Sequence, residues 1–151
     1  MSNLQHCTSL QDATGKIDYR LMNDCMFHVV FQKNPRALRG LCASLLHMHP
    51  EEILSVEVLN PIEFGEHPKT KEFILDLKVK LNNDHILNFE VQVIDENNWP
   101  ERSLSYACRP FDQLMQSEDY IKAKPVCHIG FLDFDLKHLS PEFYATFKLL
   151  N

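Results

Sequence analysis

The sequence lacks any apolar run of the roughly 18 residues that a membrane-spanning helix requires. It contains only four glycines and eight prolines in 151 residues, and no segment of low complexity or disordered composition. The polar stretch from Met1 to Gly15 has no hydrophobic centre of the kind that secretory signals carry. We therefore expect no association with a membrane, and we interpret residues 1–17 as a loose leader.

The cysteines are scattered along the chain, and no Cys-x-x-Cys pair occurs. The odd count of five argues against a disulfide framework, and the spacing argues against a structural zinc site. Reduced thiols in a cytoplasmic protein are the simplest interpretation. The sequence also contains no P-loop, no dinucleotide fingerprint and no Ser-His-Asp arrangement.

An excess of basic residues is missing as well. The formal net charge is −6 and the pI is near 5.7, whereas DNA-binding surfaces usually need a basic face. The acidic charge therefore argues against tight, non-specific binding to DNA. Two considerations weaken this argument. Carboxylates that bind metal add negative charge, which the bound cations cancel. Basic residues also cluster locally at Lys33, Arg36 and Arg39, which could contact a DNA backbone, although a solvated helix face is the plainer interpretation.

Length and a hydrophobic content of 44% support one domain with a sizeable core. We place this domain at residues 18–136, followed by a helical tail at 137–151. The periodicity of the apolar residues predicts an α/β protein whose helices precede a three-strand meander, a crossover helix and a fourth strand, which is the plan of a restriction-endonuclease-like core. The predicted helices span 18–31, 35–47, 99–116 and 140–151, and the predicted strands span 53–62, 72–81, 85–94 and 125–134. Asn23 or Asp24 could cap the first helix, and Asn34 is the expected cap of the second.

The runs at 72–81 and 85–94 alternate strictly between apolar and polar residues, which predicts a β-hairpin with one buried face. A short connection between the runs sets their register, so that Asp76 faces Glu90 and Lys78 faces Asn88. Cβ atoms of facing residues lie roughly 5 Å apart, and two carboxylates at that distance repel each other unless a cation lies between them. A divalent metal would turn this repulsion into a binding site. The alternative is a solvated hairpin face on which Lys78 and Lys80 neutralise the acids.

Three stretches of this sequence resemble the PD-(D/E)XK nuclease family transposases, also called recombination-promoting nucleases. The hairpin FILDLKVKLNNDHILNFEVQV carries an aspartate, a turn and then Glu-x-Gln, as the active-site hairpin of that family does. NDCMFHVVF resembles the opening helix of the family. The third stretch, ERSLSYACRPFDQLMQSEDYIKAKPVCHIGFLDF, resembles the segment that follows the hairpin in the family. It begins with a helix that carries an Arg-x-x-x-Tyr pair, and Tyr120 and Pro125 match the entry to the last core strand. The residues that carry these matches are Asp76, Glu90 and Gln92 in the hairpin, Asp24, Phe27 and Phe31 in the first helix, and Arg102 and Tyr106 in the later one.

The resemblance implies a metal-dependent DNA endonuclease that acts in transposition, recombination or defence against foreign DNA. Asp76 and Glu90 would hold one or two Mg²⁺ or Mn²⁺ ions, with the backbone carbonyl of Val91 as a further ligand, and Gln92 would orient the attacking water. Supporting roles are expected for three more residues. Asp24 would either reach the metal or cap its helix. Arg102 and Tyr106 would contact a phosphate, brace Glu90, or pin their helix to the sheet.

Three features depart from the general PD-(D/E)XK pattern or from the usual length of the family, although Gln92 agrees with the transposase family, which commonly carries glutamine there. Gln92 stands where most PD-(D/E)XK nucleases have lysine, Leu75 stands where the name has proline, and the chain ends at Asn151 although members are often longer. Lys78 could stand in for the missing lysine or touch DNA, but a surface ion pair is the plainer interpretation. These departures leave a second hypothesis open, an inactive remnant that binds DNA or forms a homodimer. A third hypothesis is an α/β domain with an unrelated partner.

Overall fold

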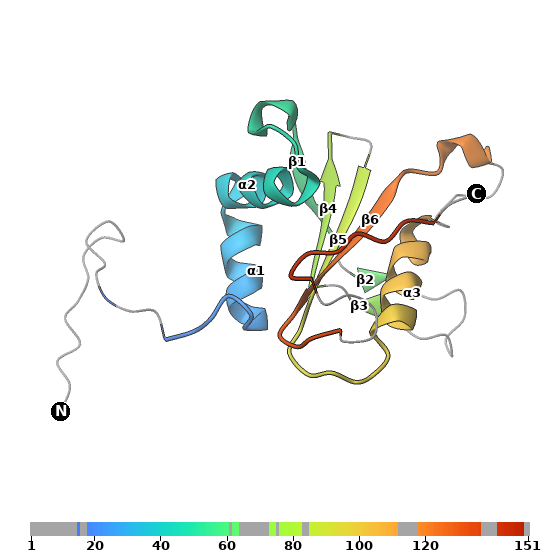
Figure 1. Ribbon diagram of the computed structural model, residues 1–151. Coiled ribbons are helices and arrows are strands. Elements are labelled where there is room, and N and C mark those ends of the chain that lie inside the picture. Colours follow the sequence, from blue (N-terminus) through green and yellow to red (C-terminus); the bar gives the residue numbers. More distant parts are fainter. Residues whose placement is uncertain are drawn as a thin grey trace.

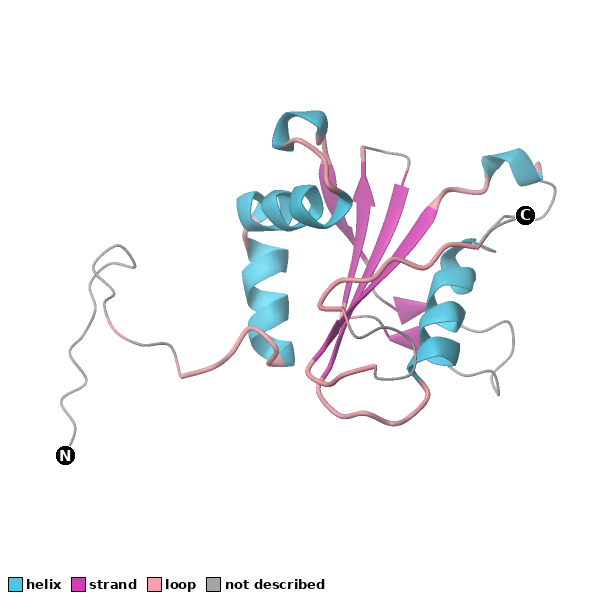
Figure 2. Cartoon of the chain, in the orientation of Figure 1, coloured by secondary structure: helices cyan, strands magenta, loops and turns pink. Residues whose placement is uncertain are grey.

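The computed structural model describes residues 15, 18–60, 62–63, 73–74, 76–82, 85–111, 118–136 and 142–149. These residues form three layers, in which a four-stranded sheet lies between helices α1 and α2 on one side and helix α3 on the other (Figures 1 and 2). This is the α/β architecture that the element order predicted. None of the helices in the described ranges is long and apolar enough to cross a membrane.

Both N-terminal helices begin at an asparagine cap. Helix α1 (Asp24–Lys33) follows Asn23, whose side-chain oxygen accepts a hydrogen bond from the N–H of Met26 at 3.2 Å. Helix α2 (Pro35–Leu46) follows Asn34, which accepts from the N–H of Ala37 at 3.0 Å. Side-chain caps of this kind satisfy N–H groups that have no partner within the helix. The prediction for α2 is confirmed to within one residue. Residues 18–23, which the periodicity included in the first helix, form bends and a turn, whereas the predicted cap at Asn23 is confirmed.

The main sheet has the strand order β1-β4-β5-β6. Strands β1 (Val56–Leu59), β4 (Leu77–Leu81) and β5 (His85–Gln92) form an antiparallel meander. Strand β6 (Val126–Leu132) runs parallel to β5, and α3 (Trp99–Phe111) connects the two. Parallel neighbours require such a crossover, so the predicted meander, crossover helix and fourth strand are confirmed.

Two predicted strands are each divided in the structure. The strand predicted at 53–62 is divided into β1 and β2 (Ile62–Glu63), and the strand predicted at 72–81 is divided into β3 (Phe73–Ile74) and β4. Strands β2 and β3 pair with each other in a separate two-stranded sheet. The division leaves Asp76 in a bend immediately before β4. Two short 3₁₀ helices, η2 (Pro50–Glu52) and η3 (Tyr120–Lys122), precede β1 and β6.

The C-terminal tail does not form the predicted helix in its described part. Residues 142–149 contain bends and irregular chain, and the apolar side chains of Phe143, Phe147 and Leu149 are exposed. A short helix is marginal in water unless one face packs against the protein, and these side chains have no such packing. Tyr144 contacts α2, because its hydroxyl donates to the carbonyl of Leu45 at 2.9 Å.

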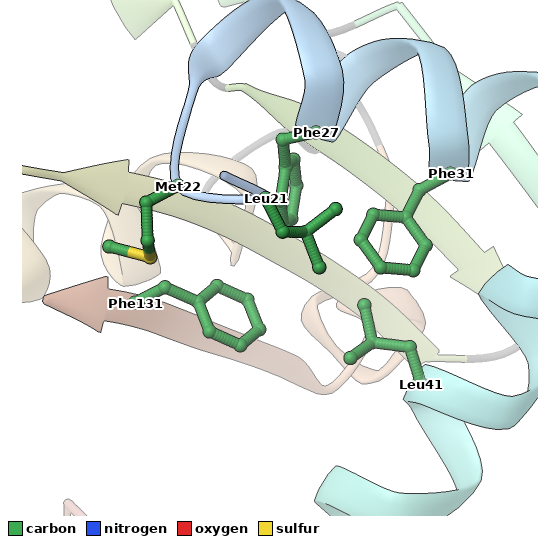
Figure 3. Close-up of a pocket in the computed structure, with 6 residues that line it drawn as sticks. All are labelled: Leu21, Met22, Phe27, Phe31, Leu41 and Phe131. Carbon is green, nitrogen blue, oxygen red and sulfur yellow. The ribbon is translucent and has the colours of Figure 1, made fainter. Parts of the chain in front are cut away.

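The hydrophobic core lies between the sheet and the layer of α1 and α2. Phe27 of α1 contacts both Phe31 and Phe131, with ring centroids 4.8 and 5.5 Å away. A small cavity of about 50 Å³ remains there, and Figure 3 shows that only apolar side chains line it. The buried residues of this core are Phe27, Phe31, Leu38, Cys42, Ala43, Ile53, Leu77, Val79, Leu81, Leu87 and Phe89.

Candidate functional site

The β4–β5 hairpin has the register that the sequence predicted. Lys78 pairs with Asn88 and Leu77 pairs with Phe89, so the next pair along the strands brings Asp76 to the side of Glu90. The Oδ2 atom of Asp76 accepts a hydrogen bond from the N–H of Val91 at 2.5 Å, which fixes the carboxylate against β5. The negative charge of Asp76 is close enough to act on the ionisation of Glu90. The structure thus brings the two predicted acids together at one end of the hairpin.

The polar face of the hairpin is buried, which contradicts the interpretation of a solvated face. Lys78 is 8% exposed, Asn88 0%, Glu90 3% and Gln92 8%. Helix α3 covers this face, and the backbone carbonyl of Tyr106 accepts a hydrogen bond from the side-chain amide of Asn88 at 2.9 Å. The sheet is therefore covered on both faces, as strands in a parallel or mixed sheet often are.

Arg102 of α3 meets Glu90 on this buried face. Its Nε donates to Oε1 of Glu90 at 2.6 Å, and Nη2 contacts the same oxygen. The other end of the guanidinium lies 3.8 Å from a carboxylate oxygen of Glu96, in the loop after β5. Tyr106, one helical turn further on, places its hydroxyl 3.4 Å from Nη2 and its ring centroid 5.2 Å from the guanidinium carbon. Arg102 and Tyr106 therefore share one helix face, as their spacing predicted.

Burial dominates the electrostatics of Glu90. Removal of the carboxylate from water raises its pKa, and the charges of Asp76 and Glu96 raise it further. The hydrogen bond and positive charge of Arg102 act in the opposite direction, but the pKa of Glu90 stays above its ordinary value. Burial, followed by the charge of Glu90, also raises the pKa of Tyr106.

Several buried polar atoms between the sheet and α3 have no hydrogen-bond partner. Among the described residues, every buried side-chain atom of this kind belongs to Asn88, Glu90, Gln92 or His128. The Oε2 atom of Glu90 is one of them, although Oε1 of the same carboxylate receives two donors from Arg102. Buried groups of this type need a water, an ion or a functional role to explain them.

A comparison with protein families identifies the family of this chain. The profile of the PD-(D/E)XK nuclease family transposases matches residues 21–151, most of the chain. The chain belongs to this nuclease family. The α/β fold, with its helices followed by a four-strand mixed sheet, is consistent with the restriction-endonuclease-like core of PD-(D/E)XK proteins. Comparisons with curated proteins and with solved structures gave no match.

The donor atoms at the hairpin of this nuclease-family protein fit a hard divalent cation. Carboxylate oxygens are preferred ligands of Mg²⁺, which keeps several waters and commonly takes only one or two carboxylates from the protein. Asp76 and Glu90 supply two, and the buried Oε2 atom of Glu90 has no other partner. No group of three or more His, Cys, Asp or Glu side chains suitable for a metal occurs in the part of the chain that the structure describes. Waters and backbone oxygens would complete the coordination.

The remaining predicted site residues lie in different surroundings. Gln92 donates from Nε2 to the carbonyl of Ile94 at 3.0 Å. Asp24 is the first residue of α1. The structure does not describe its side chain, so its role stays a prediction. Lys78 is buried, which differs from the surface ion pair or DNA contact suggested for it.

The basic group of the nuclease-family domain is separate from the two acids. Lys33 ends α1, and Arg36 and Arg39 are exposed on α2. Figure 1 shows α2 near the end of the sheet where β4 ends and β5 begins, whereas Asp76 precedes the start of β4. The structure therefore does not bring these cations to the hairpin acids.

Sequence analysis missed three residues that shape the site. Gly130 pairs with Glu90 in the parallel register, and a Cβ atom there would lie 2.0 Å from the ring of Trp99, the first residue of α3. Only glycine allows this close approach of helix and strand, and an isolated glycine inside a strand pattern is a signal for it. His128, which pairs with Asn88, stacks on Tyr106 with centroids 5.5 Å apart.

Proposed function

We propose that this protein is a metal-dependent endonuclease domain that hydrolyses DNA phosphodiester bonds. The observation that carries the proposal is the position of Asp76 beside β5, one residue beyond the Leu77–Phe89 pair and with its charge acting on Glu90, together with a buried Glu90 oxygen that has no partner. Membership of a nuclease family supports phosphodiesters as the substrate class. The biological settings that fit are transposition, recombination and defence against foreign DNA.

Each residue of the proposed site has a distinct role. Asp76 and Glu90 hold Mg²⁺ or Mn²⁺, and the backbone carbonyl of Val91 is the third protein ligand. When bound, the metal supplies activation of a water molecule and neutralisation of charge on the phosphate. The hydrogen bond from the N–H of Val91 keeps Asp76 against β5, so the ligand needs little reorganisation. Gln92 orients the water or a phosphate oxygen, since an amide cannot act as a base.

Cleavage of supercoiled plasmid by the purified full chain tests this proposal. We expect nicking with Mg²⁺ or Mn²⁺ that EDTA abolishes, and loss of nicking in both Asp76→Asn and Glu90→Gln. These substitutions preserve size and remove only the charge that a metal needs. Glu57→Gln is the matched control, because Glu57 lies on β1 and pairs with Lys80 at 3.6 Å, away from the two acids in the register. Nicking that survives in Asp76→Asn and Glu90→Gln would refute the assignment of the site.

The buried and hydrogen-bonded side chain of Gln92 favours a second function. Its amide nitrogen is engaged by the carbonyl of Ile94 and the residue is buried, at the position where most PD-(D/E)XK nucleases carry lysine. An inactive nuclease-like domain that binds DNA or forms a dimer would tolerate such a residue. Absence of nicking by the wild type with either metal, together with a plasmid mobility shift at low salt, would support this second function.

A further inference from the structure

The two oxygens of the Glu90 carboxylate have unequal surroundings. Oε1 receives both Nε and Nη2 of Arg102, whereas Oε2 is buried and has no hydrogen-bond partner. Two donors of one planar guanidinium on a single oxygen restrict rotation of the carboxylate about its last torsion. The orientation of Oε2 is therefore set by Arg102, even though the two do not bond.

Arg102 is itself held at two further points. Glu96 lies 3.8 Å from Nη1, on the side of the guanidinium away from the Glu90 contact, and the hydroxyl of Tyr106 lies 3.4 Å from Nη2. The ring of Tyr106 also stands 5.2 Å from the guanidinium carbon, within the range of a cation–π contact. These contacts come from the β5–α3 loop and from α3, so the position of Glu90 depends on the element that covers it.

We propose that Arg102 is a positioning residue, which occupies Oε1 of Glu90 and so assigns Oε2 to the metal. Asp76 directly precedes β4, next to the Leu77–Phe89 pair, and its Oδ2 is fixed by the N–H of Val91, the residue after Glu90. Glu96 acts through Arg102, because it holds the far end of the guanidinium. This inference rests on the proposed metal site and adds which oxygen binds and what orients it.

Metal affinity, rather than activity alone, tests the inference. Mn²⁺ is titrated into the full chain, and free Mn²⁺ is measured by electron paramagnetic resonance. We expect Arg102→Met to weaken Mn²⁺ binding by about 10- to 100-fold, the usual effect of removing a partner that orients a metal ligand. Arg102→Lys keeps the charge but cannot span Glu90 and Glu96 with one ammonium group, so it should recover only part of the affinity. Arg39→Met, on the exposed face of α2, is the matched control and should bind as the wild type does.

A purely structural role for Arg102 would give a different pattern. Both Arg102 variants would then melt at lower temperature but bind Mn²⁺ with wild-type affinity when folded, as checked by circular dichroism at the titration temperature. Equal or tighter binding by Arg102→Met would overturn the inference. If Arg102→Met does not fold, Arg102→Lys and Glu96→Gln decide: we expect both to bind several-fold more weakly, and wild-type affinity in both would overturn the inference.

The same titration separates this inference from the function on which it rests. A wild-type protein that binds no Mn²⁺ refutes the metal site, and the role of Arg102 in it falls as well. A wild type that binds Mn²⁺ and loses binding in Asp76→Asn, beside an Arg102→Met variant that still binds tightly, refutes only the role of Arg102.

Discussion

Both faces of the β4–β5 hairpin are buried, but the side chains on them differ in kind. The face towards α1 and α2 holds Leu77, Val79 and Phe89, which pack against other apolar side chains. The face towards α3 holds Asn88 and Glu90, each with an oxygen that has no partner. Burial therefore does not separate the two faces. The difference is that the first face buries only apolar side chains, which need no hydrogen bonds, whereas the second buries polar atoms that have no hydrogen-bond partner.

This difference has an energetic meaning. Burial of an apolar side chain such as Phe89 stabilises the fold by roughly 1.5–3 kcal/mol. A buried polar group without a partner costs about 1–3 kcal/mol. The face towards α3 thus works against stability, which is typical of a surface maintained for binding or catalysis. The apolar face therefore stabilises the domain, whereas the proposed metal site lies on the face that does not.

The largest effect is expected on the apolar face. Phe89→Ala removes a fully buried ring that stacks near Phe131, with centroids 6.4 Å apart. We expect the free energy of unfolding to fall by about 3–5 kcal/mol, as measured by urea denaturation. Val93→Ala is the control, because Val93 follows β5 but is 49% exposed, and its change should stay within about 0.5 kcal/mol. Similar losses for the two variants would contradict the assigned core.

The second largest effect is expected on the pH dependence of stability, through His128 on the polar face. Burial, and then the charge of Arg102, lower the pKa of His128 to about 4 from 6.5. In the unfolded chain the imidazole takes up a proton as the pH falls through 6.5, whereas the folded protein does not until about 4. Stability is therefore fully present above pH 6.5, and a loss on the order of 3 kcal/mol accumulates as the pH falls from 6.5 to 4.

Urea denaturation at several pH values measures this loss. His128→Phe keeps an aromatic ring against Tyr106 and should remove this part of the pH dependence. His85→Gln, at the exposed start of β5, should leave it unchanged. The same slope in wild type and His128→Phe would show that His128 is not held neutral by burial.

The smallest net effect is expected for the ion pair itself. Arg102→Leu leaves Glu90 buried without its partner, and we expect a loss of about 1–3 kcal/mol, below the full cost of a buried charge because Arg102 is 30% exposed. Adding Glu90→Leu removes the stranded carboxylate, and the double variant should return to within about 1 kcal/mol of the wild type. Thermal unfolding of the wild type, of Arg102→Leu and of the double variant measures these changes. A double variant less stable than Arg102→Leu would mean that the polar face stabilises the fold after all.

Much of the fold could be predicted from local sequence. The caps at Asn23 and Asn34 depend on a side chain and an N–H three residues away, and the hairpin register follows from alternation and a short turn. The pairing of Asp76 with Glu90 follows from that register. Other features could not be predicted, since they depend on distant partners. Examples are the division of the strand before Asp76 and the absence of a helix in residues 142–149.

The sequence by itself determined the order of the elements, the register of the hairpin and the family of the protein, because periodicity and short motifs are local properties. Only the tertiary structure decided that the polar face is buried, that Arg102 takes one oxygen of Glu90, and that Trp99 lies over Gly130. Alternation along a strand tells which side chains share a face, but a charged face looks the same in sequence whether water or a helix covers it. Packing of α3 against the sheet joins residues from separate elements, and that packing determines the electrostatics of the site.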